Sequence, residues 1–141
     1  MPNLVKNESN TKSKRIVTIE ETDFCAWLYL SMPNSMAIEK DVWLYNKIKA
    51  PKSSGIEKYQ GQAPPAPRNF IYEPGTFGKV KDQNIEFRWS EDGEAVALWI
   101  FAELHAFIVP EQKHGYSRLP KQKCPWGNPI DFDAYDRHLK S

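Results

Sequence analysis

The sequence predicts a mainly β fold, with an antiparallel sheet and one or two short helices. Two apolar runs, residues 85–89 and 94–109, flank Asp92-Gly93, and this dipeptide between two such runs is typical of a β-hairpin turn. Apolar residues also alternate with a period of two across residues 24–32, as in a half-buried strand. The chain has 141 residues, of which 13% are aromatic, so it can bury a core without a metal or a disulfide.

The beginning of the chain differs from the rest. Residues 1–14 are almost all polar and show no periodicity, so we expect a disordered tail. We predict a single domain over residues 15–141, because this length suits one domain. A first strand is expected at residues 16–19, where four β-branched residues adjoin.

Two further strands are expected in the first half of the domain. The alternating residues 24–32 form one of them, although Thr22 or Asp23 could instead cap a short helix. Residues 36–41 are expected to form a helical turn that leads into another strand at residues 42–45.

Residues 50–69 are predicted to be a proline-rich loop. They contain four prolines, and so long a connection in a small domain is uncommon unless it is functional or mobile. We expect the run from Pro64 to Pro67 to be extended and stiff, as in a polyproline helix.

The hairpin at Asp92-Gly93 dominates the second half of the chain. Its second arm, residues 94–109, has an unbroken apolar face at every second position. Because this run is long for one strand, we expect a turn near Ala102-Glu103 to divide it. Alternatively, residues 94–109 form one buried helix capped by Asp92, which would make the fold α+β.

A short C-terminal helix is expected at about residues 129–139. Asn128 is suited to cap it, and Pro129 is suited to its first position. Three residues are expected to share the face that packs on the sheet: Phe132, Tyr135 and Leu139.

Three short motifs resemble a known family. They are Trp-Ser-x-Asp-Gly at residues 89–93, His-Ala at 105–106 and Gly-Tyr-x-Arg at 115–118. In this order they resemble a family of small bacterial proteins of unassigned function, over about residues 16–120. That family usually has a Gly or Asn turn before its His-Ala motif, where this chain has residues 101–104. The resemblance implies a bacterial, cytosolic, β-rich domain and supplies no catalytic residue.

Charge and cysteine content exclude several classes of protein. The net charge of +1 gives no global attraction to nucleic acid or to anionic lipid. The longest apolar run, residues 95–102, is too short to cross a membrane, and the chain begins without the apolar stretch of a secretion signal. We therefore expect a cytoplasmic protein in which Cys25 and Cys124 are reduced thiols.

Glu103 and His105 are the candidate catalytic residues. Two positions apart on a strand, they would point to one side, where a carboxylate could orient an imidazole as a general base. The alternative is a structural pair that satisfies itself by hydrogen bonding. The histidine and cysteine spacings match no zinc pattern, so we expect no metal and no cofactor.

Four further residues are candidates for binding, because Trp, Tyr and Arg are enriched at protein interfaces. They are Trp89, Tyr116, Arg118 and Trp126. The first hypothesis is therefore a non-enzymatic bacterial protein that binds another protein, in its most concrete form an immunity-type protein that neutralises a partner toxin. The oligomeric state stays open.

Two alternatives remain. One is a small enzyme that uses Glu103 and His105. The other is weak binding of single-stranded nucleic acid by a basic and aromatic patch of four residues: Lys79, Lys81, Arg88 and Trp89. Nucleic-acid binding is disfavoured, because residues 75–80 lack the leading base and an aromatic residue of the RNA-binding motif that they resemble.

Overall fold

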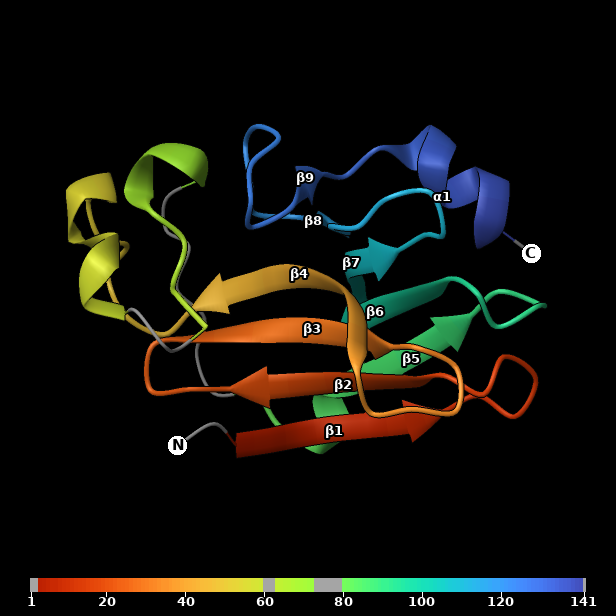
Figure 1. Ribbon diagram of the computed structural model, residues 1–141. Helices are drawn as coiled ribbons and strands as arrows, with labels where there is room; N and C mark the ends of the chain where they lie inside the picture. The colour runs from red at the N-terminus through yellow and green to blue at the C-terminus, as the bar shows by residue number, and fades with distance from the viewer. Residues whose placement is uncertain (1–2, 60–62, 73–79, 141) are drawn as a thin grey trace.

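The computed structural model describes residues 3–59, 63–72 and 80–140, and its architecture is mainly β, as the sequence predicted. The strands form a four-stranded antiparallel sheet and a five-stranded mixed sheet (Figure 1). The first sheet contains, in order, β1 (Asn3–Ser9), β2 (Ile16–Glu21), β3 (Cys25–Ser31) and β4 (Ile38–Asn46). The second contains β5 (Ile85–Trp89), β6 (Val96–Ile100), β7 (Glu103–Ile108), β8 (Tyr116–Ser117) and β9 (Asn128–Pro129). The helices are α1 (Phe132–His138) and short 3₁₀ helices at Ser53–Tyr59, Arg68–Phe70 and Asp82–Asn84.

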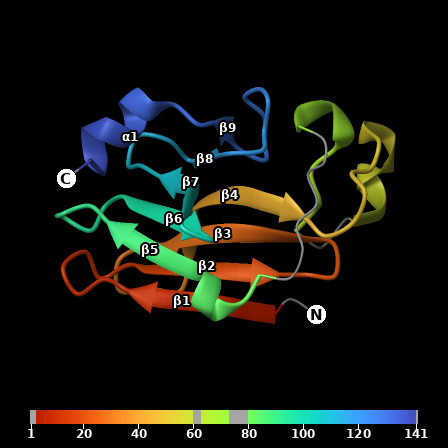
Figure 2. The ribbon, with the colours of Figure 1, turned by 180° about the vertical axis from the view of Figure 1, so that it is seen from behind.

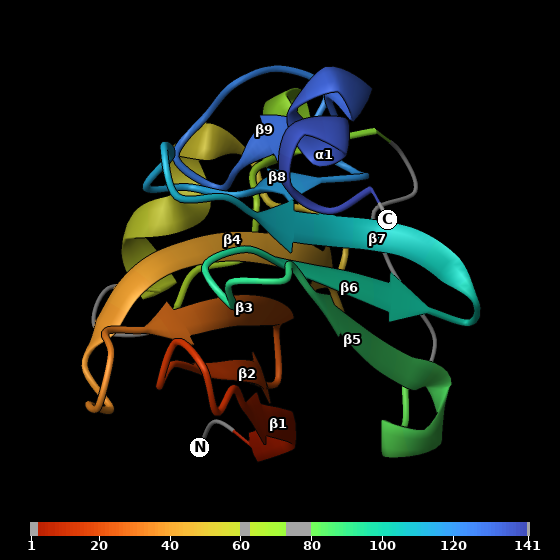
Figure 3. The same ribbon diagram turned by 90° about the vertical axis from the view of Figure 1, so that its right-hand side faces the viewer.

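The two sheets enclose an apolar core between their inner faces. Ile19 of β2 and Leu28 of β3 pack there with Leu98 of β6 and Ile108 of β7. Strands β4 and β7 lie side by side, where the two sheets meet (Figure 3). The alternation in residues 24–32 thus separates core side chains from those of the outer face.

Residues 3–9 form strand β1, so the prediction of a disordered tail is wrong for this segment. Strand β1 pairs antiparallel with β2 and lies near β5 (Figure 2). The Lys6 ammonium donates a hydrogen bond to the Ile85 carbonyl at 3.0 Å, and the Trp89 indole N–H donates to the Glu8 carboxylate at 2.6 Å. Backbone pairing and contacts with β5 therefore hold a segment whose own side chains show no apolar pattern.

The connection from β3 to β4 also differs from the prediction. Residues 36–41 form a bend and the start of β4 rather than a helical turn, because the chain reverses at Asn34, whose φ is 56°. Thr22 does not cap a helix. Its hydroxyl accepts the backbone N–H of Cys25 at 3.1 Å, in the tight turn that starts β3.

Residues 94–109 form two strands, so the helical α+β alternative is wrong. Strands β6 and β7 are joined by Phe101-Ala102, whose φ angles of 52° and 64° suit a two-residue type I′ turn. This turn lies one residue before the predicted position. Strand β7 then bulges at His105, where the register between β6 and β7 shifts.

Helix α1 begins at Phe132, later than predicted. Asp131 is its cap, since the Asp131 carboxylate accepts the backbone N–H of Asp133 at 2.9 Å. Asn128 lies in β9 instead, and its side-chain amide donates to the His114 carbonyl at 3.0 Å. Phe132 is 65% exposed, so the prediction that it packs on the sheet is wrong. The helix residues that do pack there are Ala134, Tyr135 and, just after the helix, Leu139.

The end of the predicted loop, residues 63–67, covers part of the outer face of the first sheet. We call this segment the proline strap. Ala66 is fully buried, and the Asn46 amide binds both its backbone N–H, at 2.9 Å, and its carbonyl, at 3.0 Å. The carbonyl of Pro64 accepts the indole N–H of Trp27 at 3.1 Å. The strap is therefore an integral part of the fold.

Candidate functional site

The structure does not bring the side chains of Glu103 and His105 together. Glu103 is exposed, and its hydrogen bond from Arg118, at 2.5 Å, lowers the pKa of the Glu103 carboxyl. His105 is buried, and its Nε2 donates to the Leu44 carbonyl at 2.7 Å, because a carbonyl oxygen only accepts. Burial lowers the pKa of His105 to about 4. The imidazole is therefore neutral near pH 7 and is held as a structural group.

The four predicted binding residues lie in different parts of the fold. Trp89 bonds to β1, as described above, and Arg118 pairs with Glu103. Tyr116 is only 8% exposed and stacks on Phe107, with ring centroids 4.7 Å apart. Trp126 donates its indole N–H to the proline strap at 3.2 Å. Each of these side chains thus has a partner within the chain, and the structure does not gather them into one surface.

A groove on the outer face of the first sheet is a better candidate. It has a volume of about 100 Å³ and lies on the part of that face next to Tyr29. We call it the outer groove. Its lining residues are Ile16, Thr18, Glu20, Tyr29, Ser31, Met36 and Ile38. The lining is therefore apolar at its rim, and it also contains three hydroxyls and one carboxylate.

The rim of the outer groove is unusually apolar for an exposed hairpin. Met36 is 74% exposed and Ile38 is 55% exposed, and Met32 in the same connection is 45% exposed. In the described part of the chain, half of the exposed large apolar side chains lie in this connection or at Ile38, the first residue of β4. Apolar side chains gathered on a surface mark an interaction site more often than single ones do.

The floor of the outer groove is formed by Tyr29. Its ring stacks on Trp27 with centroids 6.3 Å apart and an interplanar angle of 6°, which fixes the phenol. Burial raises the pKa of Tyr29 far above its usual range, and the carboxylates of Glu20 and Asp41 raise it further. The phenol is therefore neutral and can donate a hydrogen bond. The Asp41 carboxylate already pairs with His114, at 2.6 Å, so Glu20 supplies the negative charge of the lining.

The sequence predictions did not include the residues of this groove. The available signal was the presence of Met32, Met36 and Ile38 in an otherwise polar connection, where a folded protein has no core to bury them. The expected helical turn at residues 36–41 obscured it, because an apolar residue in a helix is readily assigned to a packed face.

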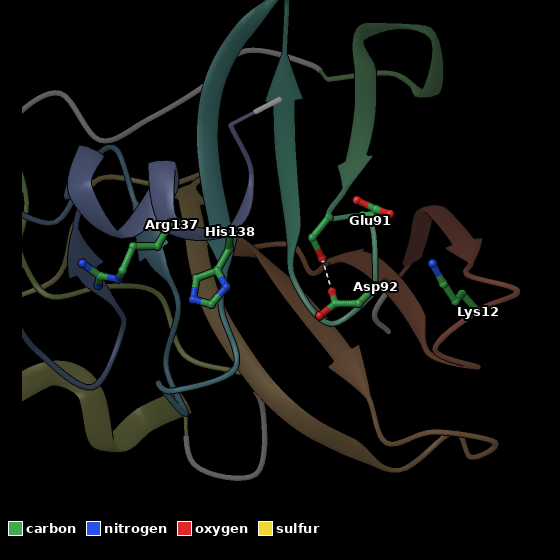
Figure 4. Close-up of a pocket in the computed structure, with 6 residues that line it drawn as sticks. Lys12, Glu91, Asp92, Arg137 and His138 are labelled. Carbon is green, nitrogen blue, oxygen red and sulfur yellow. Dashed lines mark hydrogen bonds between the residues drawn. The ribbon is translucent and has the colours of Figure 1, made fainter.

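A second hollow, of about 320 Å³, lies between two hairpin turns and the end of α1 (Figure 4). Its lining residues are Lys12, Ser90, Glu91, Asp92, Arg137 and His138. The Asp92 carboxylate accepts from the Glu94 backbone N–H at 3.0 Å and from the Ser90 hydroxyl at 2.7 Å, and these bonds lower its pKa. His138 bonds to Glu111 at 2.9 Å. Acids and bases are balanced in this lining, and several are already paired.

The cysteines do not provide a reactive thiol. Cys25 and Cys124 are both free and buried. Burial raises the pKa of Cys25 to about 11 and also raises the pKa of Cys124, so the nucleophilic thiolate is disfavoured at both positions.

Within residues 3–59, 63–72 and 80–140, no group of three or more metal-ligating side chains could hold a metal ion. In the same part of the chain, no helix has the length and apolar character needed to span a membrane. The resemblance to a bacterial family stays a prediction. A comparison of the chain with protein-family models, with curated proteins and with solved structures finds no match.

Proposed function

We propose that this chain is a non-enzymatic protein-binding domain that acts in the bacterial cytoplasm as an immunity-type protein and holds its partner at the outer groove. The observation that carries the proposal is the exposure of Met36 and Ile38 beside a fixed, half-buried tyrosine. Methionine adapts to the shape of a partner, and tyrosine is enriched among the residues that dominate binding energy.

The lining of the groove defines the chemistry of the partner. The apolar rim would bury an apolar side chain of the partner, and the hydroxyls of Thr18 and Tyr29 would bond to polar groups beside it. The Ser31 hydroxyl already accepts from the Ile16 N–H and donates to the Met32 carbonyl. Glu20 would favour a lysine or arginine next to that apolar anchor. A toxin that presents an apolar residue flanked by a basic one fits this description.

The surroundings of the other candidate residues support binding over catalysis. His105 is buried and neutral, and Glu103 is occupied by Arg118. The nucleic-acid alternative is weakened because Arg88 pairs with Glu86 and covers the ring of Trp99, with its guanidinium carbon 4.0 Å from the ring centroid. Of the two lysines of that predicted patch, Lys79 lies outside the described residues, and Lys81 is exposed.

The test is co-expression with the product of the neighbouring gene. An immunity-type protein is expected to relieve growth arrest caused by that product and to purify with it as a complex. The variant Met36→Glu/Ile38→Glu should abolish relief and weaken binding by about tenfold or more, because it adds two charges where the partner buries an apolar group. Its fold should be unchanged, since both side chains are exposed.

The matched control is Phe132→Glu, a charge placed on an equally exposed apolar residue of α1. This variant should keep both relief and binding. The proposal is contradicted if the groove variant protects as well as the unmodified chain, or if no neighbouring product is toxic or binds directly.

A further inference from the structure

A third hollow, separate from the outer groove, is lined by cations. It has a volume of about 470 Å³. Its lining residues are Lys52, Ser53, Arg68, Asn69 and Lys121. We call it the basic hollow. None of its lining residues belongs to the outer groove, so it does not depend on the function proposed above.

The backbone fixes the relative positions of the three segments that form the basic hollow. The Arg68 N–H donates to the Pro51 carbonyl at 2.8 Å, and the Lys121 N–H donates to the Phe70 carbonyl at 2.9 Å. These backbone hydrogen bonds join the segments that carry Lys52, Arg68 and Lys121, although the segments lie far apart in the sequence. The three cationic side chains start from a preformed frame.

Among the described residues, no carboxylate compensates the charge of the basic hollow. The described residues of its lining include three cations and no acid. None of these cations forms an ion pair with another residue of the described ranges. Elsewhere the arginines behave differently: Arg15, Arg88 and Arg118 each pair with a carboxylate. Three like charges around one concavity repel one another and concentrate anions there.

The neutral side chains of the lining add donors. The Ser53 hydroxyl donates to the Asn69 amide oxygen at 2.6 Å, which fixes the amide plane and leaves its NH₂ group as a donor. Together with a planar guanidinium and two ammonium groups, this set matches a group with several anionic oxygens. We propose that the basic hollow binds the phosphate group of a small phosphate monoester.

Size and charge favour this class over simpler anions. A volume of about 470 Å³ lies within the range of small-molecule sites and exceeds the size of an inorganic ion, so the hollow has room for an organic part beside the phosphate. A phosphate monoester carries nearly two negative charges at neutral pH, whereas a single carboxylate carries one. The three cations of the hollow therefore attract the phosphate group more strongly than a carboxylate.

The test is isothermal titration of the full chain with a nucleoside monophosphate, with a sugar phosphate and with inorganic phosphate, at constant ionic strength. We expect at least one monoester to bind more tightly than inorganic phosphate. Amide NMR shifts should move at residues 52–53, 68–69 and 121. The variant Arg68→Gln/Lys121→Gln should weaken binding about tenfold or more, because it removes two of the three cations.

The control is Lys113→Gln/Lys140→Gln, which removes the same charge from exposed residues outside the hollow. It should leave the affinity within about twofold. The proposal is overturned if no monoester binds below roughly 10 mM, or if the control weakens binding as much as the hollow variant does. It is equally overturned if a single-stranded oligonucleotide binds and the monoesters do not.

Discussion

Removal of the Asn46 side chain should destabilise the protein far more than its small size suggests. Asn46 is fully buried, and its amide oxygen accepts from the Ala66 N–H at 2.9 Å and from the Trp43 indole N–H at 3.0 Å. Its amide nitrogen donates to the Ala66 carbonyl at 3.0 Å. In Asn46→Ala, three buried polar groups therefore lose a partner at once.

The expected magnitude follows from these groups. An unsatisfied buried polar group costs about 1–3 kcal/mol, and some relief comes from water that enters the space, so we expect a loss of about 3–5 kcal/mol. A domain of this size has about 5–15 kcal/mol of stability, so the variant should still fold. Urea unfolding, followed by tryptophan fluorescence, measures the difference in the free energy of unfolding.

A matched variant tests whether the loss of stability comes from the buried hydrogen bonds of Asn46. Asn7→Ala removes the same side chain from an exposed position of β1 and should change stability by at most about 0.5 kcal/mol. The reasoning is refuted if Asn46→Ala costs less than about 1 kcal/mol and hydrogen exchange still shows the Ala66 amide protected, because the strap would then be held by something else.

Three further outcomes are expected. His105 has a pKa of about 4 in the folded chain, below its value of 6.5 when unfolded, so the unfolded chain binds the proton first and stability falls as the pH drops from about 6.5 to 4, by about 3 kcal/mol. Urea midpoints measured across this pH range should show the loss. The variant His105→Gln should be less stable at neutral pH but should not show the loss, and an equal pH dependence in both proteins would contradict the low pKa of His105. Gly93→Ala should cost about 1–3 kcal/mol in the same assay, because φ is +74° and the added Cβ would lie 2.3 Å from the Asn10 amide oxygen; a neutral effect would contradict this packing. The Cys25 thiol, with its pKa raised to about 11, should react with a thiol reagent at pH 8 far more slowly in the folded chain than in urea; rapid labelling of the folded chain would contradict its burial.

Local patterns predicted much of the fold. The alternation in residues 24–32 predicted strand β3, and the Asp-Gly turn between residues 85–89 and 94–109 predicted the β5–β6 hairpin. Both predictions succeed because the two-residue period of a strand is visible within the strand's own sequence. The division of residues 94–109 could also be expected from length alone.

Elements that depend on distant partners could not be predicted in this way. Strand β1 exists because it pairs with β2, and its sequence has no apolar pattern of its own. Asn128 has the chemistry of a helix cap, but its amide bonds to the carbonyl of His114, so Asp131 caps α1 instead. A side chain that can serve two purposes is assigned only when its neighbours in space are known.

The candidate site was missed for a similar reason. The aromatic residues chosen for binding, such as Trp126, satisfy partners within the fold, and composition cannot distinguish a structural tryptophan from a binding one. Met36 and Ile38 became noticeable only when the structure showed them exposed beside Tyr29.

The outer groove, with Met36 and Ile38 exposed at its rim, is the surface proposed to hold a protein partner. Hydrogen exchange of the chain, measured alone and in complex with the partner, tests this claim most directly. We expect new protection in residues 16–20, 29–31 and 36–39, which contribute the lining, and no change in α1. Protection confined to α1 and the adjoining strands β8 and β9, with residues 36–39 unchanged, would contradict the claim.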